Sequence, residues 1–101
     1  MAWGIQISVE AKTDIQEAIS WYNNKQPGLG KRFYKEITNS FKLLKRSPYF
    51  GIRYQRVRCL KVHKFPYLIH YVLDEPSQTI IIPGVLNTSL NPDEYWFKDL
   101  E

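Results

Sequence analysis

Five side chains between residues 56 and 64 could bind phosphate or another anion. Arg56 and Arg58 lie two residues apart in a predicted strand, so both should project from the same face of a sheet. Lys61 and Lys64 extend the positive charge towards the end of that strand, where His63 could also reach a phosphate. The formal net charge of +4 and the pI of about 9.2 suit an anionic partner, such as nucleic acid or an acidic protein. The alternative is that these residues are ordinary solvated surface cations.

The titratable groups that could transfer a proton are His63, His70 and Tyr95. His70 lies within an apolar strand, which favours a hydrogen-bonded core histidine over a catalytic residue or ligand. Tyr95 has aromatic neighbours, so it could instead dock a last helix. Cys59 is the single cysteine, which excludes a disulfide framework and a thiolate metal cluster. Because no carboxylates cluster around a histidine, we expect neither a metal-dependent nuclease nor any cofactor.

The first half of the chain is predicted to form a strand and a helix hairpin. Apolar residues alternate with small or polar ones over residues 3–9, which is typical of a strand with one buried face. A first helix follows, with Ser8 as its N-cap and Glu10 in its first turn, and it ends in the segment 23–30. A second amphipathic helix is predicted from Leu29 to Arg46.

The second half is predicted to form three strands and a short last helix capped by Asn91. The short connections between the strands indicate an antiparallel meander. Pro83 lacks the N–H that a central strand needs, so it should lie at an edge or at a bulge, and Gly84 suits a bulge. The predicted strands and the last helix occupy residues 54–62, 65–73, 79–86 and 91–101.

These elements predict one α+β domain over residues 1–101. Its order is β-α-α-β-β-β-α, with the helix hairpin on one face of an antiparallel sheet. No stretch approaches the roughly 20 apolar residues of a membrane span, and the N-terminus has no signal-peptide pattern, so we expect a cytoplasmic protein. The residues expected to be buried are Ile15, Ile19, Phe33, Ile37, Phe41 and Ile81.

Four segments, in this order along the chain, resemble the RelE/ParE superfamily of bacterial toxins. "AKTDIQEAISWY" (11–22) resembles the family's opening helix, and "PGLGKRFYKEI" (27–37) looks like the start of its second helix. "RCLKVHKFPYLIHYVL" (58–73) is similar to its most recognisable segment, an Arg ahead of an "FPY-x-I-x-Y" strand. "VLNTSLNP" (85–92) occupies the place of its final strand and loop. The resemblance covers nearly the whole chain.

The resemblance implies a small basic toxin of a type II toxin-antitoxin module, also known as a plasmid stabilisation protein, which an acidic antitoxin neutralises. RelE-like members cleave mRNA on the ribosome without a metal, whereas ParE-like members act against DNA gyrase. In both branches the concave face of the sheet carries the basic functional residues. Arg56 and Arg58 match the basic strand positions of the family. The candidates for catalytic cations are therefore Arg58, Arg56 and Lys61, and the candidates for target or RNA binding are Lys64, His63, Asn87 and Tyr95.

The sequence departs from the RelE-like pattern at two places that matter for RNA cleavage. Leu68 stands where many RelE-like toxins have Arg, and Asn87 and Leu90 stand where the final loop often has His and Arg. Asn cannot shuttle a proton and Leu cannot stabilise a charged transition state. A ParE-like toxin that acts by binding is therefore favoured. The alternatives are a RelE-like mRNA endoribonuclease, a degenerate toxin and a non-catalytic RNA-binding module.

Overall fold

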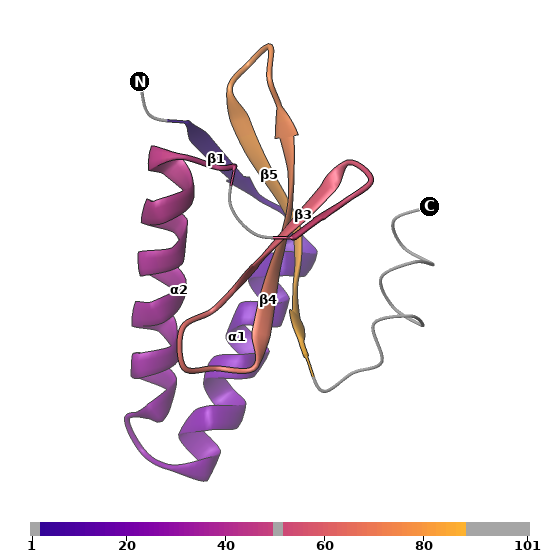
Figure 1. Ribbon diagram of the computed structural model, residues 1–101. Helices are drawn as coiled ribbons and strands as arrows, with labels where there is room; N and C mark the ends of the chain where they lie inside the picture. Colours follow the sequence, from indigo (N-terminus) through magenta and orange to yellow (C-terminus); the bar gives the residue numbers. More distant parts are fainter. Residues whose placement is uncertain (1–2, 50–51, 89–101) are drawn as a thin grey trace.

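The computed structural model describes residues 3–49 and 52–88, which form two helices and a five-stranded sheet (Figure 1). The helix hairpin lies against one face of the sheet, with α1 on β5 and α2 beside β1. The predicted last helix, with Asn91 and Tyr95, lies outside the described residues. No described helix has the length and apolarity needed to cross a membrane. The elements are β1 (Gly4–Ile7), α1 (Val9–Lys25), α2 (Leu29–Arg46), β2 (Ile52–Tyr54), β3 (Val57–Lys61), β4 (Tyr67–Asp74) and β5 (Thr79–Asn87).

Helix α1 begins as its sequence predicts. The Ser8 side chain accepts a hydrogen bond of 3.0 Å from the backbone N–H of Ala11, and Glu10 occupies the first turn. Val9 was expected to end the first strand, but it begins the helix and is 74% exposed. The cap at Ser8 interrupts the alternating pattern, so the strand ends at Ile7.

The connection between the helices depends on two glycines. Gly28 has a φ of +89°, in the left-handed region that favours glycine. Gly30 lies at a close approach of α2 to α1, because a Cβ on it would come within 2.5 Å of the Ile19 carbonyl oxygen. The Gly30 N–H also donates to the Asn23 side-chain oxygen at 2.9 Å. The tight hairpin therefore requires a residue without a side chain at position 30.

The strand order is β1-β5-β4-β3-β2. Strands β2 to β5 pair in antiparallel fashion, which confirms the predicted meander. β1 pairs in parallel with β5, from Gly4–Thr79 to Ile7–Ile82, so the sheet is mixed rather than wholly antiparallel. The predicted strand at 54–62 is also wrong in part, because a turn at Gln55 and Arg56 divides it into β2 and β3. Gln55 adopts a φ of +54°, although neither it nor Arg56 is one of the residue types that usually form turns.

Pro83 lies at a bulge, as its missing N–H predicts. The pairing of β4 with β5 passes from His70–Gly84 to Val72–Ile81, so β5 has one more residue than β4 across this interval. β1 pairs only as far as Ile82, so Pro83 is not required to donate to β1. An internal strand can therefore contain a proline.

The core lies between the sheet and the two helices. The rings of Tyr22, Phe33, Phe65 and Tyr67 form one cluster, with centroids 5.0–6.2 Å apart. Of the six residues expected to be buried, Ile15, Phe33 and Ile37 are buried, and Ile19 and Phe41 are half-buried against the core. Ile81 is also half-buried, because Ile80 and Ile82 on either side of it face the helices. The prediction therefore assigned β5 to the wrong face.

Candidate functional site

The predicted cations lie at opposite ends of β3. Arg56 is exposed in the turn that precedes the strand, and Arg58 is half-buried near its start. Lys61 ends the strand, and His63 and Lys64 are exposed in the turn that follows. The expectation that Arg56 and Arg58 alternate along one strand is wrong, because Arg56 is a turn residue.

Arg58 lies on the helix-covered side of the sheet, near its edge. It pairs across the strands with Tyr71, whose ring is fully buried in the core and whose hydroxyl donates to the Pro48 carbonyl oxygen at 3.0 Å. The Arg58 guanidinium carbon lies 5.4 Å from the centre of the Tyr49 ring, in a cation–π arrangement. Arg58 therefore has a packing partner next to α2. With Arg56 and Glu75 it lines a polar pocket beside the start of β3 and the end of β4.

Lys61 projects from the opposite face of the sheet. It is three residues from Arg58, an odd separation that reverses the side-chain direction and spans roughly 10 Å of strand. Its ammonium group donates to the carbonyl oxygens of Val62 and Phe65, both at 3.3 Å. In the turn beyond, Lys64 has a φ of +70°. Lys61 and the turn residues thus form a second basic region, separate from Arg58.

His70 is buried, as its apolar surroundings predict, but it lies on the face of the sheet opposite the helices, the face from which Lys61 projects. It is 3% exposed and pairs across the strands with Cys59, which is 4% exposed. The Cys59 sulfur lies 3.5 Å from His70 Nδ1, within hydrogen-bonding distance. Burial raises the pKa of the Cys59 thiol to about 11, so the sulfur stays protonated at neutral pH and is a poor nucleophile. This pair therefore serves the packing of the sheet.

Asn87 ends β5 at the same end of the sheet as Lys61. Leu68 pairs with both Lys61 and Leu86, which places these three residues in one row across the strands. Asn87 is half-buried opposite Tyr67. The structure thus brings Lys61 and Asn87 to one end of the sheet and leaves Arg56 and Arg58 at the other. Tyr95 and Leu90 lie outside the described residues.

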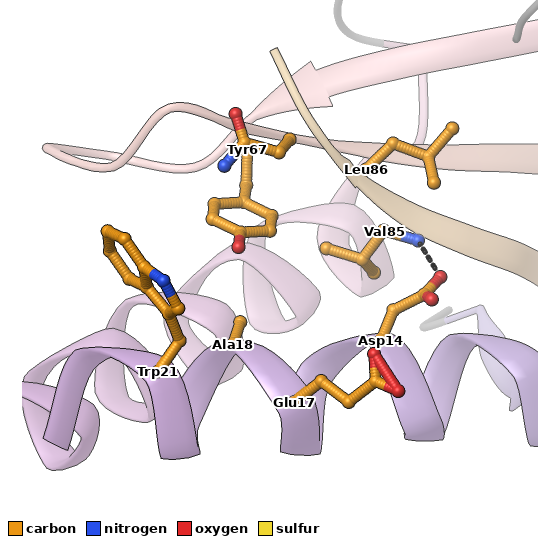
Figure 2. Close-up of a pocket in the computed structure, with 8 residues that line it drawn as sticks. Asp14, Glu17, Ala18, Trp21, Tyr67, Val85 and Leu86 are labelled. Atoms are coloured by element: carbon orange, nitrogen blue, oxygen red, sulfur yellow. Dashed lines mark hydrogen bonds between the residues drawn. The ribbon is translucent and has the colours of Figure 1, made fainter. Parts of the chain in front are cut away.

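A groove that sequence reasoning missed lies between α1 and the last residues of β5 (Figure 2). Asp14, Glu17 and Trp21 line it from the helix, and Tyr67 and Val85 line it from the sheet. The Asp14 carboxylate accepts a hydrogen bond of 3.1 Å from the Val85 N–H. Burial is the main reason that the pKa of Asp14 lies above its ordinary value. The spacing of the three α1 residues, i, i+3 and i+7, was the available sequence signal.

The comparisons with known proteins identify a family and a shared fold. A family model described as the ParE toxin of the type II toxin-antitoxin system parDE matches residues 5–91. A chain of the chromosomal ParDE system from P. aeruginosa matches with a TM-score of 0.74 and 15% identity, over 85% of this chain and 96% of that one. The curated proteins include no match.

Two RelE-type structures are also similar. A chain of the RelBE2 complex from Mycobacterium tuberculosis gives a TM-score of 0.63 and 16% identity, over 86% of this chain and 99% of that one. A variant of E. coli toxin RelE with two arginines replaced, in the free state, gives a TM-score of 0.71 and 13% sequence identity over the whole of both chains. At these identities, the structural matches establish the shared fold alone.

Proposed function

The chain belongs to the ParE toxin family of type II toxin-antitoxin systems, and from that membership we propose that it acts by binding a target such as DNA gyrase and is neutralised by an acidic antitoxin. Such a target implies a cytoplasmic protein. The family match supports the ParE-like branch of the superfamily. The distribution of charge over the sheet supports action by binding.

The observation that carries the proposal is that the predicted cations do not converge on one site: Arg56 and Arg58 line one pocket, and Lys61 lies away from it. Cleavage of RNA needs a base, an acid and charge stabilisation within reach of one phosphate. Here Arg58 packs on Tyr49 on the helix side, whereas Lys61 projects from the other face and is held by two carbonyl oxygens. Separated cations can still attract an anionic surface. They would bind the RNA substrate and the transition state of cleavage equally well, and such equal binding does not raise the turnover number.

The helix hairpin supplies a further basic surface for an acidic partner. The solvent side of α2 carries exposed cations along its whole length, among the exposed apolar side chains of Tyr34 and Leu43. A negatively charged antitoxin would be steered towards this surface, and added salt would slow their encounter. The exposed cations of α2 are Lys31, Arg32, Lys35, Lys42, Lys45 and Arg46.

A pair of assays tests the mode of action. Purified chain is added to a gyrase supercoiling reaction, and in parallel to a translation extract programmed with a defined mRNA. We expect inhibition of supercoiling and no codon-positioned cleavage. Rapid mRNA cleavage that disappears in Arg58→Ala would overturn the proposal in favour of a RelE-like endoribonuclease. Silence in both assays, with no growth arrest on induction, would identify a degenerate toxin.

A further inference from the structure

The groove between α1 and β5 has the size and composition of a binding site for a side chain. Its volume is about 400 Å³, and it is open to solvent. Figure 2 shows the Trp21 indole and the Tyr67 ring on the same side of α1 as Ala18, with Asp14 beyond them at the β5 backbone. β1 ends at Ile7, opposite Ile82, so it leaves the edge of β5 beside the groove uncovered.

The charge of the groove is opposite to that of the whole chain. Its lining residues, all in the described part of the chain, include the carboxylates of Asp14 and Glu17 and no Lys or Arg. Glu17 and Glu10 act on Asp14 with like charge, and after burial they further raise its pKa, whereas the hydrogen bond from Val85 lowers it. A cation in the groove would therefore replace repulsion between carboxylates by attraction.

The chemical type of the cation follows from the aromatic residues that line the rest of the groove. Among the described residues, no group of three or more His, Cys, Asp or Glu side chains could hold a metal ion. Trp21 is 52% exposed, and its ring already accepts the Lys25 ammonium group at 4.9 Å from its centre. Aromatic faces together with carboxylates suit an organic cation, and they suit a planar guanidinium best.

We propose that this groove receives an arginine side chain of the antitoxin, with the guanidinium between the Asp14 and Glu17 carboxylates and the Trp21 and Tyr67 rings. The identity of the partner rests on the proposed function. A partner that is acidic overall would be drawn to the basic surface of α2, and this one arginine would fix where it sits on α1. The site thus supplies register and specificity rather than long-range attraction.

A titration with a small probe tests the groove without any partner. N-acetyl-arginine amide is added to ¹⁵N-labelled chain, and N-acetyl-citrulline amide serves as the uncharged control of similar shape. We expect the Trp21 indole and Val85 N–H signals to shift in a saturable way with the arginine probe and about tenfold less with citrulline. Equal shifts with both probes, or none, would overturn the inference.

Two variants connect the groove to the antitoxin. Asp14→Asn/Glu17→Gln removes both charges but keeps an acceptor for the Val85 N–H, and Glu10→Gln removes a nearby charge that does not line the groove. For the acidic protein encoded beside this chain, we expect the double variant to weaken binding about tenfold or more and Glu10→Gln to have less than about threefold effect. Spectra of the free variants confirm their fold.

The outcomes separate this inference from the proposed function. If wild type and double variant hold the antitoxin equally, the groove assignment fails and the toxin-antitoxin pairing stands. If one Arg→Gln change in the antitoxin weakens binding to the wild type but not to the double variant, the groove and its occupant are both established. If the wild type binds no acidic partner, the proposed toxin-antitoxin pairing fails. The proposal that an antitoxin arginine occupies the groove then fails too, even if the small arginine probe binds.

Discussion

The two charged regions of this protein are built in different ways. The predicted cations on and beside β3 are spread over both ends and both faces of the strand, whereas two carboxylates of α1, those of Asp14 and Glu17, converge on one groove. The difference arises from the elements that carry them. Along a strand, side chains three residues apart project from opposite faces, but on a helix residues three, four or seven apart share a face. The net charge of a segment therefore indicates the charge of its binding partner. Whether the charged side chains form one binding site depends on the helix or strand that carries them.

The largest expected effect on stability comes from a substitution in the helix hairpin, which carries the α1 side of the groove. Gly30→Ala places a Cβ 2.5 Å from the Ile19 carbonyl oxygen, so the helices must separate and the hydrogen bond that the residue-30 N–H donates to the Asn23 side-chain oxygen must lengthen. We expect a loss of about 2–4 kcal/mol in the free energy of unfolding, measured with urea. Gly4→Ala is the matched control, because its Cβ would meet nothing closer than 3.9 Å. Equal stability of the two variants would show that the hairpin can relax.

A second change acts on the opposite region, next to Arg58. Tyr71→Phe removes the hydroxyl that donates to the buried Pro48 carbonyl oxygen across the end of α2. We expect a loss of about 1–2 kcal/mol in urea denaturation, because the carbonyl loses a buried partner. Tyr34→Phe, at a tyrosine 54% exposed on α2, should change stability by less than about 0.5 kcal/mol. Unchanged stability of Tyr71→Phe would mean that the hydrogen bond from Tyr71 to Pro48 does not stabilise this region.

A third pair of changes compares the two arginines themselves. Arg58→Ala loses the contact with the Tyr49 ring and should cost about 0.5–1 kcal/mol of stability. Arg56→Ala, in the exposed turn, should cost almost nothing. Thermal unfolding of both variants checks the difference. If Arg56→Ala proved the more costly change, the packing assigned to Arg58 would be incorrect.

The smallest effect sharpens the description of the groove. The pKa of Asp14 is raised in the folded chain, mainly by burial, so the ionised form is disfavoured there. Its contribution to stability is then fully present below the unfolded-state pKa and is lost as pH rises through the folded-state pKa. Asp14→Asn should therefore gain stability relative to wild type as pH rises over this range. Denaturation of both proteins across acidic pH measures the gain, with Asp74→Asn as an exposed control.

The sequence was informative where local chemistry decides the structure. The Ser8 cap, both ends of α2 and the bulge at Pro83 each follow from residues next to one another. The turn at Gln55 and Arg56 was missed because the alternation of side chains continues through it and no Gly, Asn or Pro marks it. The parallel pairing of β1 depends on a strand far along the chain, which no local pattern indicates.

Sites were harder to predict than elements. The types of the residues at 56–64 correctly indicated positive charge, but their faces depended on where β3 begins. The groove needed both α1 and β5 to be placed, because Asp14 meets Val85 across 71 residues of sequence. Ile81 was misassigned for a related reason, since three consecutive isoleucines do not reveal which of them face the helices.

The parallel pairing of β1 with β5 also sets the order in which a newly made chain can fold. Gly4 pairs with Thr79 and Ile7 with Ile82, so β1 has no strand to pair with until β5 has been synthesised. Until then, the inner face of α1, with Ala11 and Ile15, lacks the β5 side chains that bury it. Contacts between segments so distant in sequence slow folding and leave apolar surface exposed during synthesis. A ribosome therefore has to synthesise β5 before β1 can join the sheet.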